Sequence, residues 1–262
     1  MAGGGQLIHI RLNEEKKVYF ASDQHLGAPN GEESRVRERR FVQWLDEIKA
    51  DCQVLFLLGD LFDFWFEYKQ VVPRGFVRVL GKLGELSDSG IQIYFFSGNH
   101  DLWMRDYLEK EIGAEVFHDR KSFQINDSRF FIAHGDGLGP GDKGYKRMKK
   151  LFRNKIAQFF FYLLHPDFAV WLGNYMSRKN KLISGDEDVK FLGEDNEWLV
   201  QYAKRKLEQS HFDYFIFGHR HMPMEIRVGE NSVYMNLGDW VNHFTYAVFD
   251  GSKLSLERNI AQ

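Results

Sequence analysis

Short apolar runs alternate with longer amphipathic segments over most of the chain. Seven runs rich in β-branched and aromatic residues have the length and the polar or glycine boundaries of strands: 18–22, 53–58, 91–97, 130–134, 214–218, 233–237 and 245–250. Segments 33–49 and 76–89 instead repeat apolar residues at the three- and four-residue spacing of one helix face. Strands that alternate with helices predict a layered α/β domain.

Residues 139–200 depart from this alternation. Strand-like runs are missing from this stretch of the sequence, several helical segments follow one another, and the stretch is too long for a plain connection. We interpret it as a helical insertion, or cap, carried by a single domain that spans residues 1–262.

Polar residues stand where five of the predicted strands end. The motifs are Asp23-Gln24-His25, Gly59-Asp60, Gly98-Asn99-His100-Asp101, His134-Gly135-Asp136 and Gly218-His219-Arg220-His221. Because ligand sites in α/β sheets form beyond the carboxyl ends of the strands, we expect the five turns to converge.

The residue types in these turns are those of a two-metal centre. Two cations about 3.5–4 Å apart can clamp the attacking and leaving oxygens of a phosphoryl displacement. Carboxylate, amide and imidazole ligands suit Mn, Fe or Zn. We expect Asp60 to bridge two divalent cations, of which one is completed by Asp23, His25 and His221 and the other by Asn99, His134 and His219.

Each motif alone has a simpler interpretation. A single Asp-X-His pair is more often a surface or core pair than a metal site, and Gly-Asp is more often a turn. The ordered set of five, each at the end of a predicted strand, is what favours a metal centre. Asp63, Asp101 and Asp136 are further carboxylates that could orient the imidazoles.

Charge and composition narrow the class of protein. A formal net charge of −2 is too near neutral to indicate a nucleic-acid partner. The single cysteine, Cys52, excludes an internal disulfide and fits a reducing compartment. We see neither a signal peptide nor an apolar run long enough to span a membrane, so we expect a cytoplasmic protein.

The whole set of motifs, from about residue 18 to residue 246, resembles the signature of the calcineurin-like metallophosphoesterases. The resemblance implies a four-layer α/β/β/α sandwich, two metal ions held by the seven residues named above, and His100 facing the scissile phosphate. His100 and Asp101 are the candidate catalytic residues. His100 would neutralise charge on the phosphoryl oxygens or assist the leaving group, and Asp101 would hold its tautomer.

A narrower resemblance comes from residues 59–65, residues 134–138, and Asp142 followed by Gly144-Tyr145. These resemble the UDP-2,3-diacylglucosamine pyrophosphohydrolase family of lipid A biosynthesis, as does a helical insertion after the His-Gly-Asp motif. The resemblance implies a pyrophosphate substrate, release of UMP and a diacylated glucosamine 1-phosphate, and a preference for Mn²⁺. Many members carry Arg after the motif Asn, whereas this chain has His100, as the broader signature does.

The insertion bears on the substrate. Residues 159–164 and 168–171 are apolar beyond one helical stripe, and lysines and arginines surround them. One interpretation is a packed helical hairpin with a solvated basic face. The other is an apolar slot for acyl chains beside cations for phosphates or anionic headgroups, which fits a peripheral position on a membrane. The candidate substrate contacts are Asn99, His100, Asp142, Arg178, Asn180 and Lys181.

Other functions remain open from the sequence. The first is a phosphodiesterase or nucleotide pyrophosphatase of the same superfamily that acts on a soluble substrate. The second is a scaffold without catalysis, although such scaffolds usually lose ligands and this chain keeps them. A nuclease is disfavoured by the near-neutral charge and the apolar insertion.

Overall fold

The computed structural model describes residues 7–139, 149–150, 152–184 and 191–260, with only the backbone described for 178–184. The strands are β1 (Ile8–Ile10), β2 (Lys17–Ala21), β3 (Cys52–Leu57), β4 (Gln92–Phe96), β5 (Glu115–Phe117), β6 (Lys121–Ile125), β7 (Ser128–Ile132), β8 (Tyr214–Phe217), β9 (Pro223–Gly229), β10 (Ser232–Leu237), β11 (Thr245–Phe249) and β12 (Leu254–Arg258). The helices are α1 (Gly31–Ile48), α2 (Val77–Asp88), η1 (Leu108–Ile112), α4 (Lys155–Tyr162), α5 (Pro166–Ser184) and α6 (Trp198–Leu207).

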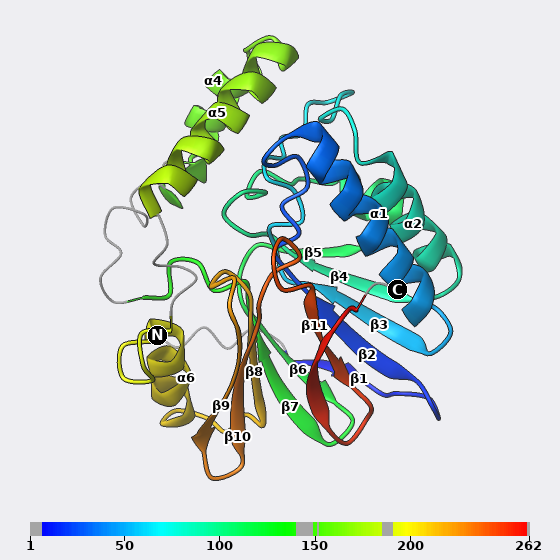
Figure 1. Cartoon of the computed structure of the whole chain (residues 1–262), viewed down its shortest axis with the longest axis vertical. Coiled ribbons are helices and arrows are strands. Elements are labelled where there is room, and N and C mark those ends of the chain that lie inside the picture. The colour runs from blue at the N-terminus through cyan, green and yellow to red at the C-terminus, as the bar shows by residue number, and fades with distance from the viewer. Residues whose placement is uncertain (1–6, 140–148, 151, 185–190, 261–262) are drawn as a thin grey trace.

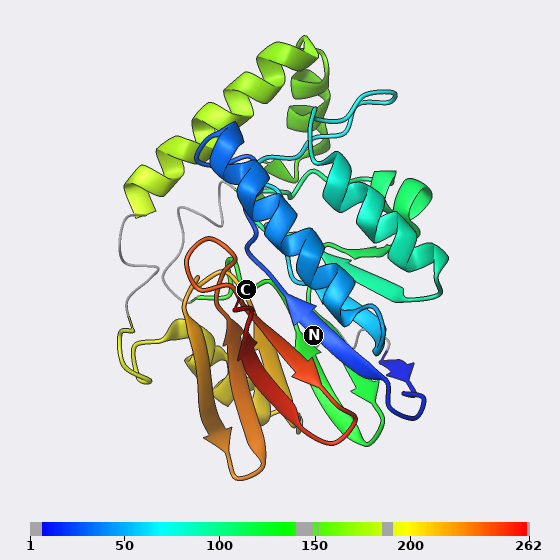
Figure 2. The ribbon, with the colours of Figure 1, turned by 45° about the vertical axis from the view of Figure 1, so that its right-hand side comes forward.

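The strands form two six-stranded sheets that pack face to face (Figure 1). Sheet I has the order β1-β6-β7-β8-β10-β9, and sheet II has the order β12-β11-β2-β3-β4-β5. Helices α1 and α2 cover the outer face of sheet II, and α6 covers the outer face of sheet I (Figure 2). The expected four-layer α/β/β/α sandwich is confirmed.

The alternation of side chains along the strands produces these layers. In β2, Val18 and Phe20 point into the core between the sheets, whereas Tyr19 and Ala21 point into the core beneath α1 and α2. Both faces of the central strands are buried, which explains why their sequences read as continuous apolar runs.

The parallel strands bring their carboxyl ends to one edge of the sandwich. In sheet II, β2 pairs with β3 and β3 with β4 in parallel. In sheet I, β8 pairs in parallel with both β7 and β10. The turns that follow these six strands are therefore neighbours, although they are far apart in sequence.

Helices α4 and α5 stand away from the sandwich as a hairpin in both views (Figures 1 and 2). Phe161 of α4 packs on Phe66 and Trp103, with ring centroids 4.8 and 4.6 Å apart, and the indole N–H of Trp103 donates to the carbonyl of Phe152. The hairpin thus rests on the loops that follow β3 and β4.

The described part of residues 139–200 contains no strand, as expected. Helix α6 begins at Trp198, near the end of this stretch, and packs on sheet I through Leu199, Val200 and Ala203. That the chain is one domain with residues 139–200 as an insertion stays a prediction. Among the described residues, none of the helices combines the length and apolar composition needed to cross a bilayer.

Candidate metal centre

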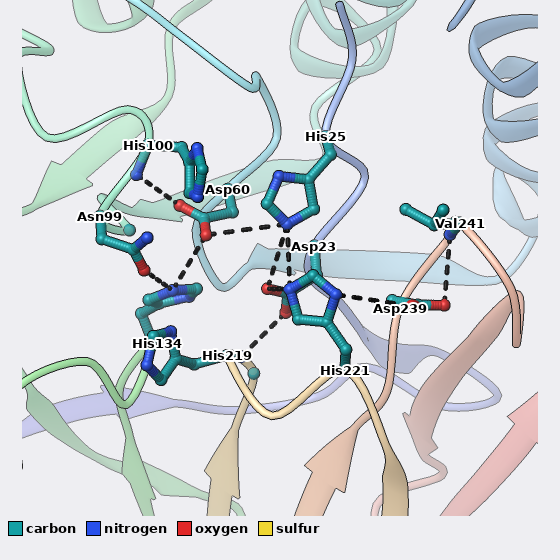
Figure 3. A network of polar contacts seen from close by, with 12 residues as sticks. Asp23, His25, Asp60, Asn99, His100, His134, His219, His221, Asp239 and Val241 are labelled. Atoms are coloured by element: carbon teal, nitrogen blue, oxygen red, sulfur yellow. Dashed lines mark hydrogen bonds and ion pairs between the residues drawn. The ribbon is translucent and has the colours of Figure 1, made fainter. Parts of the chain in front are cut away.

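The predicted ligands meet at the edge where the parallel strands end. Figure 3 shows Asp23, His25, Asp60, Asn99, His134, His219 and His221 facing a common space from five different turns. Two separate groups of these side chains place ligand atoms close enough to hold a cation: Asp23, His25 and His221 form one, and Asp60, His134 and His219 form the other. The structure thus brings the predicted ligands together, and their binding of metal ions stays a prediction.

The first group lies beyond β2 and β8. His25 Nε2 is 3.0 Å from His221 Nε2, and His221 Nε2 is 3.3 Å from Asp23 Oδ1. Asp23 Oδ1 is buried, and it faces the imidazole of His221. A buried carboxylate oxygen and two imidazole nitrogens that lie this close together are a donor set that suits a cation.

The second group lies beyond β3, β4, β7 and β8. His134 Nε2 is 3.1 Å from Asn99 Oδ1 and 3.4 Å from Asp60 Oδ2. The rings of His134 and His219 have centroids 5.1 Å apart. The amide oxygen of Asn99 therefore lies beside this group, and its role as a ligand stays a prediction.

Asp60 connects the two groups. Its Oδ2 lies 3.4 Å from His134 Nε2 and 3.8 Å from His25 Nε2, so one oxygen faces an imidazole of each group. Its Oδ1 accepts the backbone N–H of His100 at 2.8 Å, which holds the carboxylate in this orientation. Asp60 thus lies between the two groups, and its role as a bridging carboxylate stays a prediction.

The backbone at the ligands is strained in a consistent way. Five ligands have a positive φ, which non-glycine residues rarely adopt and which clusters at functional sites: Asp23 (59°), His25 (45°), Asp60 (53°), His219 (69°) and His221 (50°). Gly98 admits no side chain, because a Cβ there would lie 2.1 Å from Asp60 Oδ1. The turns thus hold five of the ligands in a backbone conformation that non-glycine residues rarely adopt.

The close approach of these charged side chains shifts their pKa values. Burial alone would raise the pKa of Asp60, but the imidazoles of His134, His100 and His25 hold it well below its usual range. Burial alone would lower the pKa of His134, yet the charge and hydrogen bond of Asp60 raise it to about 10. The carboxylates thus favour positive charge in the cage formed by the seven predicted ligands, as they would favour a bound cation.

Carboxylates outside the cage orient its imidazoles. His25 Nδ1 lies 3.3 Å from Asp63 Oδ1, and His221 Nδ1 lies 3.6 Å from Asp239 Oδ2. His134 Nδ1 is 2.6 Å from the carbonyl oxygen of Leu58. Each contact leaves the opposite ring nitrogen to face the cage.

Asp101 has a different neighbourhood from the one expected. Its two oxygens accept the backbone N–H groups of Gly98 and Leu61 at 2.7 and 2.9 Å, and so it ties together the turns after β3 and β4. Asp63, not Asp101, lies beside the His100 ring, with 3.7 Å between His100 Nδ1 and Asp63 Oδ1. The Asp101 carboxylate thus supports the backbone of the two turns and does not hold the tautomer of His100 by direct contact. Catalytic roles for His100 and Asp101 stay predictions.

The expected substrate contacts are only partly visible. Asn99 and His100 border the cage, and the His100 side chain is 11% exposed. Asp142 and the side chains of Arg178, Asn180 and Lys181 lie outside the described residues. Asp136, expected to orient an imidazole, is buried near His134 and forms an ion pair with Lys149.

Three residues that support the site were not predicted from the sequence. Asp239 follows β10 as Asp60 follows β3, so its place after a strand and a glycine was a usable signal. Ser177 touches Asp63 and His100 from α5, and Glu197 forms a buried bidentate ion pair with Arg220 between two histidine ligands. Nothing in the local sequence marks Ser177 or Glu197.

Comparison with known proteins agrees with this geometry. Residues 16–223 match the model of the calcineurin-like phosphoesterase family. The chain belongs to this family. The family predicted from the motifs is thereby confirmed, and with it a hydrolase whose clustered ligands imply divalent metals.

Several relatives of this family member share one name. A protein from Porphyromonas gingivalis named UDP-2,3-diacylglucosamine hydrolase is 40% identical over 255 residues, which cover 92% of this chain and 97% of the relative. Proteins of the same name from Haemophilus influenzae and Neisseria meningitidis are each 26% identical, over 232 and 229 residues, and each match covers 87% of this chain and 92% of the relative.

Proposed function

We propose that this family member hydrolyses the pyrophosphate of UDP-2,3-diacylglucosamine, with UMP and 2,3-diacylglucosamine 1-phosphate as products in lipid A biosynthesis. The observation that carries the proposal is the cage itself, in which Asp60 stands between two groups of carboxylate, amide and imidazole ligands. Relatives with this substrate in their name, matched over nearly their whole length, support the choice of substrate.

The cage is suited to two divalent cations, and we propose Mn²⁺ for both. When bound, the cations would supply Lewis-acid activation of the scissile phosphoryl group and of a water molecule. Asp23, His25 and His221 would hold one, Asn99, His134 and His219 the other, and Asp60 both. The buried carboxylates and imidazoles would keep bulk water away from this centre.

The residues at the rim would bind and orient the substrate. His100 borders the cage and has a partly exposed side chain, so it can donate a hydrogen bond to a phosphoryl oxygen as negative charge grows there. Asp142, Arg178, Asn180 and Lys181 remain proposed contacts for the rest of the substrate.

The hairpin of α4 and α5 is proposed to receive the acyl chains and to meet the cytoplasmic membrane surface. Its exposed aromatic residues include Phe159, Phe160, Phe168 and Trp171. Such residues in water favour apolar ligands or an interface. We therefore place the protein in the cytoplasm, peripherally on the inner face of the membrane.

The test compares three substrates with the metal-free protein and after addition of Mn²⁺. UMP release from UDP-2,3-diacylglucosamine should exceed that from the unacylated UDP-N-acetylglucosamine, and bis(4-nitrophenyl) phosphate should be cleaved slowly. An Asp60→Asn variant should be inactive with all three. Equal rates for the acylated and unacylated nucleotides would overturn the substrate while leaving the phosphoesterase.

A further inference from the structure

We propose that Ser177, on α5 of the hairpin, is a positioning residue that sets the orientation and tautomer of His100. The proposal rests on the phosphoester hydrolysis proposed above and adds a residue that acts through His100. It also makes the docking of the hairpin a condition for an active centre, because Ser177 reaches the site only from α5.

The contacts around the His100 ring carry the proposal. Ser177 is 7% exposed, and its hydroxyl donates to Asp63 Oδ2 at 2.8 Å. The same Oγ lies 3.0 Å from His100 Nδ1, and the carbonyl oxygen of Asp63 lies 3.0 Å from that nitrogen as well.

Counting protons around this ring assigns its tautomer. A serine hydroxyl has one proton, which here goes to the Asp63 carboxylate, so towards His100 it can only accept. The Asp63 carbonyl can only accept as well. Since both neighbours of Nδ1 are acceptors, Nδ1 carries the proton, and Nε2 is left to work on the substrate.

Helix α5 is docked so that Ser177 arrives at this position. Ala169, Gly173 and Ser177 are spaced four residues apart and are all buried, so they form one narrow face of the helix. At Gly173 a Cβ would lie 2.2 Å from the Phe64 ring, which shows how closely the helix approaches. Phe64 follows Asp63 directly, so one turn of α5 seats Gly173 on Phe64 and Ser177 on Asp63.

Asp63 has a second contact that makes this arrangement consequential. Its other oxygen, Oδ1, lies 3.3 Å from Nδ1 of the ligand His25. The two rings pack edge to face, with centroids 4.8 Å apart. Ser177 thus holds the Asp63 carboxylate, which lies between the ligand His25 and His100.

The experiment uses the full-length protein in three variants: Ser177→Ala, which removes the hydroxyl, Ser177→Thr, which keeps it, and Ser232→Ala as a matched control. Ser232, like Ser177, is a buried serine whose hydroxyl donates a hydrogen bond. Its acceptor is the carbonyl oxygen of Phe212, at 2.7 Å, and it stands at the start of β10. Each variant is assayed with Mn²⁺ on bis(4-nitrophenyl) phosphate and on the acylated nucleotide.

We expect Ser177→Ala to lower kcat about 10-fold on both substrates, the size of one lost positioning hydrogen bond, with KM and Mn²⁺ content unchanged. Ser177→Thr and Ser232→Ala should stay within about twofold of the wild-type protein. A raised KM with unchanged kcat would make Ser177 a substrate contact and overturn the proposal, as would equal losses in Ser177→Ala and Ser232→Ala.

A second readout does not depend on activity. Ring ¹⁵N shifts of ¹⁵N-histidine-labelled, Zn²⁺-loaded protein, with His100 assigned by its loss in His100→Ala, should show Nδ1 protonated in the wild type and a tautomer mixture in Ser177→Ala. An unchanged tautomer would overturn the inference. If the wild-type protein cleaved neither substrate, the proposed function would fall, and the ¹⁵N result would still decide the Ser177 contact.

Discussion

Aromatic side chains are found in two regions of opposite character. Between the sheets, Phe20, Phe56 and Phe130 are fully buried and stack with centroids 4.9 and 6.0 Å apart. On the α4–α5 hairpin, Phe160 and Trp171 are 64% and 58% exposed. The same residue class serves packing in the first region and remains available for contact in the second.

The difference follows from the period of each backbone. A strand turns successive side chains to opposite faces, and in a sandwich both faces are covered. Residues 159–161 are three consecutive phenylalanines on a helix, so they point in three directions about 100° apart. Phe161 packs on the loops that follow β3 and β4, whereas Phe159 and Phe160 point in other directions and stay exposed.

This contrast predicts that changes in the sandwich act on every substrate, and the largest effect is expected at Asp60. Asp60→Asn should abolish hydrolysis of both the acylated nucleotide and bis(4-nitrophenyl) phosphate, because both cations share this carboxylate. Metal analysis should show less than one Mn²⁺ per chain. Asp46→Asn, at an exposed ion pair with Lys82, is the control and should keep full activity and metal.

His100→Ala should lower kcat by roughly 10²–10⁴ on both substrates, the usual contribution of a positioned acid or donor. The cage ligands are untouched, so Mn²⁺ content should remain that of the wild-type protein. Full activity with full metal content would remove His100 from the chemistry.

Glu197→Gln should destabilise the fold by about 3 kcal/mol, because it removes the counter-charge of a buried guanidinium. Arg220 Nε and Nη2 lie 3.0 and 2.9 Å from the Glu197 oxygens, and both side chains are almost fully buried. Urea unfolding measures the loss. Glu194→Gln, at an exposed pair with Lys204, should cost less than about 1 kcal/mol.

The metal-free protein should lose stability as pH rises from 6.5 to 9. Burial alone would lower the pKa of His134 and His221, but the carboxylates beside them raise both to about 10. A pKa raised above the unfolded value of roughly 6.5 stabilises the fold at low pH, and this contribution fades as pH approaches 10. Unfolding with EDTA should show a loss of about 1 kcal/mol per pH unit for each of the two imidazoles. Saturating Mn²⁺ should abolish or reverse this slope, and an unchanged slope would contradict the cage.

The hairpin should show the smallest and most selective effect. Trp171→Ser should raise KM for the acylated nucleotide about 10-fold, the value of one buried apolar side chain, and leave bis(4-nitrophenyl) phosphate unaffected. Stability should change by less than about 0.5 kcal/mol, because the side chain is exposed. Equal losses of activity on both substrates would show that the hairpin does not act selectively on the acylated nucleotide, and would contradict the contrast with the sandwich.

Much of the sandwich and its cage could be read from the sequence because both obey local rules. Continuous apolar runs mark the strands that are buried on both faces, and Asp60, Asn99 and His134 each follow a parallel strand, so topology alone brings them together. Asp239 obeys the same rule and was missed because it stands outside a recognised motif.

The contacts of the hairpin could not be read in this way. Whether Ser177 meets His100 depends on how closely α5 approaches Phe64, which is decided by packing between residues more than a hundred positions apart. The contacts of Asp101 could not be predicted for the same reason: its position next to His100 in sequence did not show that its oxygens accept hydrogen bonds from Gly98 and Leu61. Its catalytic role stays a prediction.

The left-handed backbone of the ligand turns has one more consequence. These turns are held by hydrogen bonds within the protein, such as those from His25 N to Asp60 O and from His219 N to Asp23 Oδ2, at 2.9 and 3.0 Å. Small zinc domains fold only around their ion. Here hydrogen bonds within the protein hold the ligand turns. Removal of the metal by a chelator should therefore leave the protein folded but inactive, and added Mn²⁺ should restore activity without refolding.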